Sequence, residues 1–375
     1  MAAGTRDLVL GVDVGTSGVG VVALDRDGRA VARADHPVPL ATPQPGWTEQ
    51  DPEDWVAATD VGLREVARAV GGDRVAGIGL SGQMHGMVAL DGDDRVVRPA
   101  LLWNDQRTAD AVASITAAVG RARLIERTGN PAITGFQLPK VVWLRAHEPE
   151  AFARTQRVLL PKDFVGFRLT GEAVAEPSDA SGTGAYHLAA GAWDTEVLGA
   201  LDLDPGLWPR LVRSDEIVGG LRGPVATRTG LRPDTPVVAG AGDNAAAATG
   251  LALGRAHPDV GSVSLGTSGV LFAALDAATP DPQGRVHLFA HADGGFHLLG
   301  VILSAAGSLR WYRDTFAPGR PFDALVAEGA ASPVGAGGVT FKPYLAGERT
   351  PHPDPLARGA FVGLTVRHAL PHMTR

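Results

Sequence analysis

Short hydrophobic runs separated by glycine and proline occur along the whole chain, a pattern typical of many strands and turns. Residues 8–24 predict two β-strands around a tight turn, because apolar residues precede Gly15 and follow the turn. Residues 260–275 repeat this plan, and both turns carry the sequence Gly-Thr-Ser-Gly-Val. The copies begin at Gly15 and Gly266, too far apart for a solenoid repeat of about 20–50 residues. The repetition therefore indicates two related domains.

Between the hairpins, helical and strand patterns alternate, which predicts an α/β protein. Asp51, followed by Pro52 and two acidic residues, predicts the start of a helix that reaches about Val70. Further helices are predicted at residues 137–147, 162–169 and 245–253, and strands at residues 75–80, 87–90, 96–103 and 236–239.

Composition narrows the class of protein. With 375 residues, 45% hydrophobic and 20% charged, the chain can bury one large core or two, and two domains are expected. The lack of cysteine excludes disulfides, thiolate nucleophiles and cysteine-ligated metals. A net charge of -7 without a Lys/Arg-rich block disfavours nucleic acid or anionic lipid as a partner. Asp7 interrupts the apolar N-terminus and no run approaches the ~20 apolar residues of a membrane span, so a cytoplasmic protein without a membrane partner is expected.

The repeated turns have a composition suited to binding phosphate. Glycine lets backbone N–H groups approach a ligand, and threonine and serine hydroxyls can point at phosphate oxygens. An ordinary hairpin is the alternative for a single copy, but two equivalent copies favour two phosphate-binding turns. Asp13 precedes the first turn, whereas the second copy has Ser264 there. A carboxylate beside phosphate predicts a Mg²⁺ site in the first copy only, and hence an ATP-dependent phosphotransferase.

Two residues outside the hairpins are candidates for contact with a second substrate. Asp243 follows a buried strand in a glycine-flanked turn, where it can act as a general base or simply cap a helix. His85 lies at the end of another strand, where open α/β sheets bind ligands, although a hydrogen-bonded loop histidine is the alternative. The pattern Gly240-x-Gly242-x-x-Ala245 is a weak dinucleotide fingerprint, and the position of Asp259 before a strand counts against a dehydrogenase.

Three histidines, His287, His291 and His297, suggest a metal site near residues 293–295. We expect them instead to belong to a hairpin, because strand alternation is predicted to place some of them on separate faces. The phosphate-binding sequence G-x-x-x-x-G-K-[ST] is absent, so a nucleotide site here is not a P-loop.

Nine short motifs are spread over nearly the whole chain. They are GVDVGTSGVG from Gly11, PGWTEQDP from Pro45, SGQMHGMV from Ser81, LLWNDQR from Leu101, DASGTG from Asp179, GAGDNAAAATG from Gly240, SLGTSGV from Ser264, LSAAGSLRW from Leu303 and GERTPHPDP from Gly347. Together they resemble the FGGY family of carbohydrate kinases, and within it the xylulokinase branch. The loop Gln-Met-His-Gly at 83–86 is the most specific part of this resemblance.

The resemblance implies an α/β fold of duplicated actin-like (ribonuclease H-like) domains around a cleft, and an enzyme that phosphorylates D-xylulose with ATP and Mg²⁺. By similarity, Asp243 takes the proton from the C5 hydroxyl as that oxygen attacks the γ-phosphate. Asp13 would hold Mg²⁺, directly or through water. The residues implied to contact the sugar are Met84, His85, Asp243 and Asn244, and those implied to line the phosphate path are Thr16, Ser17, Gly266 and Thr267.

The expected domains are residues 7–254, which bind the sugar, and residues 259–375, which bind the nucleotide, with a connection at 255–258. Gly20 stands where the family usually has lysine or arginine, so weaker ATP binding is expected. The family continues beyond the position of Arg375, so we expect the second domain and the adenosine half of the ATP site to be incomplete.

Two alternatives to a xylulose kinase stay open from the sequence. One is a sugar-binding protein that has lost kinase activity, and the other is a kinase for another pentulose, polyol or sugar acid. Related kinases are commonly dimers, so the resemblance also suggests a homodimer.

Overall fold

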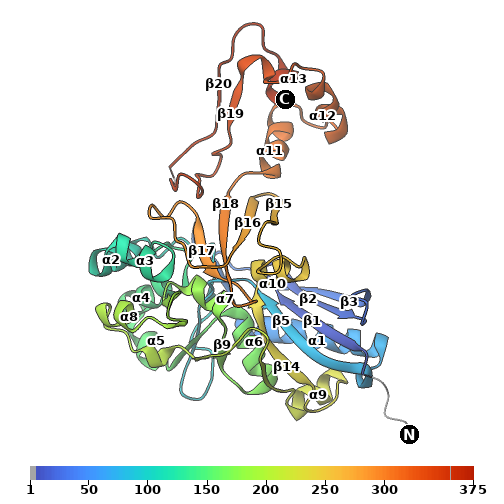
Figure 1. Ribbon diagram of the computed structural model, residues 1–375, viewed down its shortest axis with the longest axis vertical. Helices are drawn as coiled ribbons and strands as arrows, with labels where there is room; N and C mark the ends of the chain where they lie inside the picture. The colour runs from blue at the N-terminus through green and yellow to red at the C-terminus, as the bar shows by residue number, and fades with distance from the viewer. Residues whose placement is uncertain (1–5, 355) are drawn as a thin grey trace.

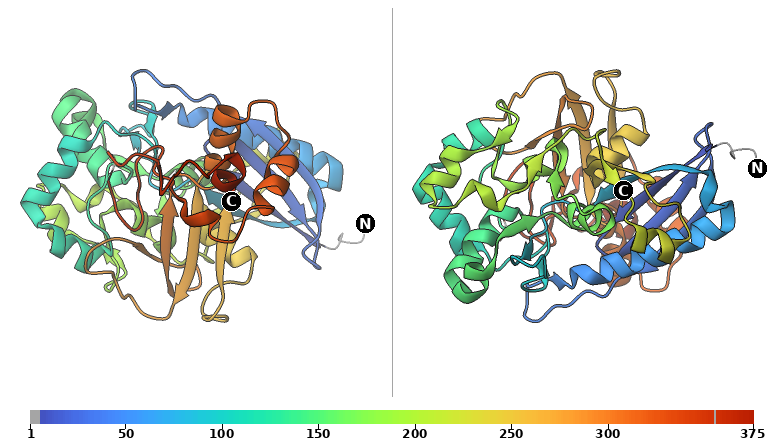
Figure 2. Two further views of the ribbon diagram at one scale, coloured as in Figure 1. Left: turned by 90° about the horizontal axis from the view of Figure 1, so that it is seen from above. Right: turned by 90° about the horizontal axis from the view of Figure 1, so that it is seen from below.

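The computed structural model describes residues 6–354 and 356–375. Figure 1 shows a broad body, which contains the N-terminal part of the chain, and a projection formed by the C-terminal residues. Seen from above and below (Figure 2), this projection lies over the body. Among the described residues, no helix is long and apolar enough to cross a membrane.

A six-stranded mixed sheet forms the centre of the N-terminal part, in the order β13-β14-β5-β1-β2-β3. Strands β1, β5 and β14 are parallel, and the other pairs are antiparallel. Parallel pairing brings the carboxyl ends of β1, β5 and β14 to one edge of the sheet. The strands are β1 (Leu8–Val14), β2 (Gly18–Leu24), β3 (Ala30–Pro37), β5 (Val75–Gly82), β13 (Ile217–Gly220) and β14 (Pro236–Gly242).

The two faces of this sheet differ. One face buries alternate apolar residues, such as Leu10 and Val12, against helices α1 (Pro52–Val70), α6 (Pro161–Thr170) and α9 (Gly223–Thr229). The opposite face is open and carries glycines at many of the alternating positions. Asp51 caps α1 by accepting a hydrogen bond from the Glu53 N–H at 3.0 Å, which confirms the predicted helix start.

A helical region with its own core lies beside the sheet. Its core includes Trp143 and Trp208, which lie among leucine, isoleucine and valine side chains. Its helices are α2 (Ala109–Val119), α3 (Arg121–Thr128), α4 (Gln137–His147), α5 (Pro149–Arg154), α7 (Pro177–Ala180) and α8 (Thr195–Ala200). Four two-stranded sheets also occur in the described N-terminal part of the chain. They pair β4 (Glu49–Gln50) with β7 (Ala100–Leu101), β6 (Val88–Leu90) with β8 (Arg157–Leu159), β9 (Val174–Ala175) with β12 (Arg210–Leu211), and β10 (Tyr186–His187) with β11 (Ala192–Trp193).

The C-terminal part begins with a four-stranded antiparallel sheet in the order β15-β16-β18-β17. Its strands are β15 (Gly261–Leu265), β16 (Gly269–Leu275), β17 (His287–Ala290) and β18 (Phe296–Ile302). The projection above it has a small separate core around Tyr312 and Leu325. Its elements are α11 (Ala306–Phe316), α12 (Phe322–Ala330), β19 (Thr340–Lys342), β20 (Ala360–Val362) and α13 (Leu370–Thr374).

The two parts share a hydrophobic core. Phe136, which precedes α4, packs in one cluster with Phe272 and Phe289 of the second sheet. At the same boundary, Asn130 donates a hydrogen bond to the Leu288 carbonyl at 2.8 Å. The predicted boundary between two domains, at residues 255–258, directly follows Leu253 of this shared core. The division into two domains stays a prediction.

Most predicted elements are present, with differences at their ends. Helix α4 spans Gln137–His147 as predicted, because its start and its apolar pattern are local signals. Strands β5 and β14 run two and three residues further than predicted, since parallel pairing continues through their terminal glycines. Helix α10 (Asp243–Gly250) begins earlier than predicted, directly after β14.

We predict that Phe289→Ala lowers the free energy of unfolding by about 3–5 kcal/mol, because a side chain only 1% exposed leaves a cavity between the two parts. Urea unfolding followed by circular dichroism measures this loss. Phe322→Ala is the matched control, since that ring is 37% exposed and should cost less than about 1 kcal/mol. Equal losses in the two variants would show that the shared core does not join the parts.

Candidate functional site

Three parallel strand ends assemble the candidate site. Strand register places Asp13 of β1 beside Ser81 of β5, and Ser81 beside Ala241 of β14. The Ser81 hydroxyl donates a hydrogen bond to Asp13 Oδ1 at 2.9 Å. Asp243 follows β14 as the first residue of α10. The topology therefore brings two carboxylates that are far apart in the sequence to one edge of the sheet.

Asp243 is not the cap of its helix. The N-cap of α10 is Gly242, which offers no side-chain hydrogen bond. Asp243 Oδ1 accepts hydrogen bonds from the Asn244 backbone N–H at 2.7 Å and from Asn244 Nδ2 at 2.9 Å. Within residues 6–354 and 356–375, Oδ2 of Asp243 has no hydrogen bond. One carboxylate oxygen is thus held in place and the other is available to a ligand.

The surroundings of Asp243 raise the pKa of its carboxyl group. Burial and the nearby Asp13 carboxylate raise this pKa to about 6, although the hydrogen bonds from Asn244 oppose the change. At neutral pH the group is therefore ionised. A carboxylate with a pKa this close to neutrality is well suited to accept a proton from a hydroxyl.

His85 is held by its backbone and by its ring. Its φ of 69° lies in the left-handed region, which is unusual for a residue with a side chain. The Lys140 ammonium of α4 donates hydrogen bonds to the carbonyl oxygens of His85 at 3.0 Å and Phe136 at 3.1 Å, and to that of Gly135. The imidazole stacks on Phe136 with 4.7 Å between ring centroids.

The hydrogen bond of the His85 ring fixes which nitrogen carries the proton. Nδ1 lies 2.6 Å from the Gly182 carbonyl oxygen, which can only accept, so Nδ1 carries the proton. Burial, helped by the charges of Lys140 and Arg349 and opposed by the Gly182 carbonyl, lowers the pKa of His85 to about 3. The ring is neutral at physiological pH, and Nε2 is left as an acceptor for a ligand hydroxyl.

Glycines allow three loops to close around this point. A Cβ atom on Gly182 would lie 2.7 Å from His85 Nδ1 and 2.9 Å from Met84 Cε, and one on Gly242 would lie 2.9 Å from Met84 Cγ. Met84 is only 4% exposed and fills the space between these loops. Met84 and His85 thus lie beside Gly182 and Gly242, and Asp243 and Asn244 directly follow Gly242 in the chain.

The first glycine-rich turn is tied to the body by Thr16. The Thr16 hydroxyl donates to Gln83 Oε1 at 2.9 Å and accepts from Trp103 Nε1 at 2.9 Å, and its carbonyl accepts from Gln50 Nε2 at 2.8 Å. Ser17 beside it is exposed. Thr16 therefore fixes the conformation of the turn, while Ser17 presents its hydroxyl to the outside.

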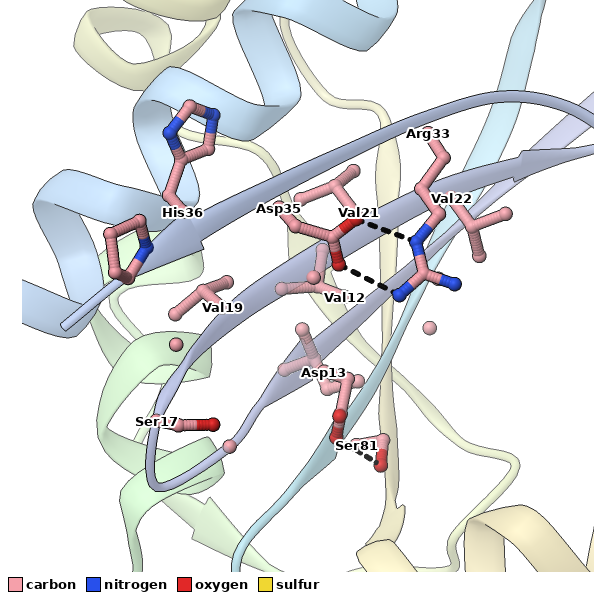
Figure 3. A pocket seen from close by; sticks show the side chains of 17 residues that line it. Val12, Asp13, Ser17, Val19, Val21, Val22, Arg33, Asp35, His36 and Ser81 are labelled. Atoms are coloured by element: carbon pink, nitrogen blue, oxygen red, sulfur yellow. Dashed lines mark hydrogen bonds and ion pairs between the residues drawn. The ribbon is translucent and has the colours of Figure 1, made fainter. Parts of the chain in front are cut away.

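A cavity of about 840 Å³ extends from this turn along the open face of the sheet (Figure 3). Asp13 and Ser17 lie toward one end of it, and Arg33 lies toward the other. Arg33 forms two hydrogen bonds with Asp35, at 2.7 and 2.8 Å. Gly20 pairs with Asp35 across strands β2 and β3 and has no side chain to carry a charge. The positive charge on this wall of the cavity comes from Arg33, in its ion pair with Asp35.

The second glycine-rich turn differs in conformation from the first. Val14 pairs with Val19 around a four-residue turn, whereas Leu265 pairs with Gly269 around a three-residue turn. Gly266 and Thr267 are exposed, and the Thr267 carbonyl accepts a hydrogen bond from the Ala305 N–H at 2.9 Å, just before α11. No hydrogen bond between described residues joins the two turns. Identical sequences thus adopt different turns.

The three histidines are placed differently from the prediction. Their register puts His287, His291 and His297 on the same side of the β17–β18 hairpin, so the expectation of separate faces is wrong. All three rings are buried and contact Phe272 or Phe289. Among the described residues, no group of three or more His, Asp or Glu side chains could hold a metal ion.

Two residues near His85 are not indicated by the sequence. Lys140 is fully buried and holds the His85 backbone, although a lone lysine in a helix usually lies on the surface. Arg349 lies close enough for its charge to lower the pKa of His85 and of His287. It belongs to the motif Gly-Glu-Arg-Thr-Pro, whose contacts are too distant in sequence to predict.

Comparison with known proteins gives consistent matches. Residues 8–250 match the N-terminal domain of the FGGY family of carbohydrate kinases, and residues 261–375 match the C-terminal domain of that family. A xylulose kinase of Escherichia coli (strain K12) is 41% identical over 98% of this chain and 75% of its own length.

Solved structures show the same likeness. A crystal structure described as a xyloylose kinase from Brucella ovis is 41% identical, with a TM-score of 0.91, over 98% of this chain and 75% of the other. A gluconate kinase from Lactobacillus acidophilus is 28% identical, with a TM-score of 0.93, over 98% of this chain and 74% of the other.

We predict that His85 stays neutral, with its proton on Nδ1, between pH 5 and 8, because burial lowers its pKa to about 3. Nitrogen-15 NMR of the imidazole measures both properties, and the His85→Gln variant assigns the signal. A His85 signal that titrates near pH 6.5, or one that places the proton on Nε2, would contradict the geometry.

Proposed function

Because the chain belongs to the FGGY family of carbohydrate kinases, we propose that it transfers the γ-phosphate of ATP to the C5 hydroxyl of D-xylulose, giving D-xylulose 5-phosphate. The observation that carries the chemistry is Asp243, with one carboxylate oxygen fixed and the other free at the edge of the sheet. The choice of sugar is supported by relatives about 40% identical, which are xylulose kinases. The gluconate kinase, whose name points to a sugar acid, is more distant at 28% identity.

The sugar is bound by the loops around His85. The Nε2 atom of His85 accepts a hydrogen bond from one sugar hydroxyl, because Nδ1 is occupied by the Gly182 carbonyl. Met84 contributes an apolar wall, and Asn244 offers the remaining hydrogen of its side-chain amide. This arrangement recognises a polyol with adjacent hydroxyl groups rather than a flat or apolar ligand.

The transfer step uses Asp243 as the base. As the C5 oxygen forms its bond to the γ-phosphorus, the bond from that phosphorus to the β–γ bridging oxygen breaks and ADP leaves. The C5 hydroxyl proton passes to Asp243 Oδ2. The pKa of about 6 allows Asp243 to be ionised before the step and to hold the proton after it.

Asp13 fits the role of a Mg²⁺ ligand. Its carboxylate is exposed near the end of β1, and within the described part of the chain only its Oδ1 accepts a hydrogen bond, from the Ser81 hydroxyl. Carboxylate oxygens and water are the ligands that Mg²⁺ prefers. When bound, the ion would neutralise phosphate charge.

The phosphates of ATP would lie along the glycine-rich turns. Ser17 is the exposed hydroxyl of the first turn, and Gly266 and Thr267 are exposed in the second. Thr16 would support the first turn through its three hydrogen bonds to the body. Arg33 lies on the same wall as Gly20, but its charge is paired with Asp35, so it replaces the family's usual basic residue only if ATP displaces Asp35.

The same proposal includes the roles of the two domains, the cellular location of the protein and its oligomeric state. Residues 7–254 would bind the sugar and residues 259–375 the nucleotide. We place the protein in the cytoplasm, where ATP is available, and as a homodimer by resemblance to related kinases. Light scattering coupled to gel filtration tests the dimer, since a monomer would have the mass of one 38.7 kDa chain.

We predict that Asp243→Asn lowers the turnover of D-xylulose with Mg-ATP by at least about 100-fold, because the amide cannot take the proton. The sugar affinity, measured by calorimetry, should stay within a few-fold, since the amide still accepts a hydrogen bond. Asp259→Asn is the matched control at an exposed loop position and should be fully active. Full activity of Asp243→Asn would disprove its role as base.

We predict that kcat/KM rises with pH through about 6 and then levels off. Asp243 must be ionised to act as base, and its raised pKa of about 6 means that activity is present above this pH and lost below it. A pH profile from 4.5 to 8 measures the acid limb. A limb near pH 4 would show that Asp243 is not perturbed in the active chain.

A further inference from the structure

Four ionisable side chains lie completely inside the protein behind residues 240–242. These residues form the irregular end of β14, where the chain turns toward Asp243. Lys162 Nζ lies 2.5 Å from Asp163 Oδ1, 3.4 Å from Glu176 Oε1 and 3.6 Å from Asp179 Oδ2, and each of these side chains is at most 3% exposed. Buried charges cost several kcal/mol each unless they are paired, and an apolar core would often be as stable. A cluster of this kind therefore calls for a role other than stability.

Glu176 is the centre of this cluster. Its Oε1 accepts hydrogen bonds from the Ser178 hydroxyl at 2.8 Å and the Asp179 N–H at 2.9 Å. Its Oε2 accepts from the Ser178 N–H at 2.9 Å and the Ser214 hydroxyl at 2.6 Å. The carboxylate thus receives four hydrogen bonds and the charge of Lys162. In contrast, both oxygens of Asp179 are buried and have no hydrogen bond from any residue that the structure describes.

The two serines connect Glu176 to both ends of the turn that carries Asp243. The Gly242 N–H donates to the Ser178 hydroxyl at 3.1 Å. The Gly240 N–H donates to the Ser214 carbonyl at 3.0 Å. Ser178 and Ser214 each donate their hydroxyl hydrogen to a Glu176 carboxylate oxygen. The orientation of the two serines therefore depends on a hydrogen-bond acceptor at the position of Glu176.

The turn has little freedom to adjust. Gly240 has a φ of 79°, and a Cβ atom there would lie 1.8 Å from the Leu80 carbonyl oxygen. On the other side, Met84 occupies the space beside Gly242. A small displacement of this turn would carry Asp243 with it, and a misplacement of about 1 Å near reacting atoms can cost roughly 100-fold in rate.

We infer that Glu176 is a positioning residue for the phosphoryl transfer, acting through Ser178 and Ser214 on the turn that aims Asp243 at the sugar hydroxyl. The inference rests on the proposed function, in which Asp243 is the base. The Lys162 ammonium, 3.4 Å from Glu176 Oε1, pairs with this carboxylate, which accepts the two serine hydroxyl hydrogens. Burial raises the pKa of Asp179 well above its usual range, so this neighbour can carry a proton and leave the charge of Lys162 to Glu176 and Asp163.

A purely structural role is the competing explanation, since Glu176 also caps the short helix α7. The two roles make different predictions. A cap contributes to the stability of the whole fold, whereas a positioning residue acts on the transfer step. Ser178→Ala separates them, because it removes the link to Gly242 but leaves the backbone hydrogen bonds of the cap in place.

The test compares Glu176→Gln and Ser178→Ala with the wild-type chain, using D-xylulose and Mg-ATP. Glutamine has the shape of glutamate, but its NH₂ group cannot accept a serine hydrogen. We expect kcat to fall roughly 100-fold in Glu176→Gln and at least about 10-fold in Ser178→Ala, with KM for the sugar within about threefold. Glu172→Gln, at a surface position 54% exposed, is the matched control and should keep full activity.

Melting temperatures and crystal structures of the variants complete the test. We expect Ser178→Ala to melt close to wild type while its Asp243 carboxylate is displaced. If both variants keep kcat within threefold of an active wild type, or if kcat and melting temperature fall only together, the inference is overturned and the proposed function stands. A wild-type chain that does not phosphorylate the sugar overturns the proposed function, and the inference with it.

Discussion

The parallel pairing of β1, β5 and β14 is the constraint on which the candidate site depends. Parallel neighbours end at the same edge of a sheet, so Asp13, Ser81 and Asp243 meet there although they are distant in sequence. Burial and the repulsion by the Asp13 carboxylate then raise the pKa of Asp243 to about 6. The raised pKa of Asp243, the proposed base, follows from strand order rather than from any short motif alone.

A second requirement is the close approach of loops to this edge. Gly182, Gly240 and Gly242 let backbone and side chains pack at distances that a Cβ atom would prevent. His85 is held between the Gly182 carbonyl and the ring of Phe136, and Phe136 belongs to the core shared with the C-terminal sheet. The surroundings of His85 are therefore connected to the C-terminal sheet through Phe136.

The sequence predicts local features well and long-range contacts poorly. The first hairpin, α1 and α4 follow from turn residues, a cap and apolar periodicity, all within a few positions. Asp243 is recognisable because of its glycine-flanked turn. In contrast, the position of Arg33 on the same cavity wall as Gly20, the contact of Lys140 with His85 and the network of Glu176 depend on contacts between distant segments. Even two identical turn sequences differ, because only the second one packs against the start of α11.

The central claim is that this edge of the sheet directs phosphate to one hydroxyl of a pentulose. The most direct measurement is a phosphorus–proton correlation NMR spectrum of the product formed by the wild-type chain from D-xylulose and Mg-ATP. We expect one phosphorus signal that correlates with the protons on C5, together with ADP in equal amount. Phosphate on another carbon, or ADP formed without phosphorylated sugar, would contradict it.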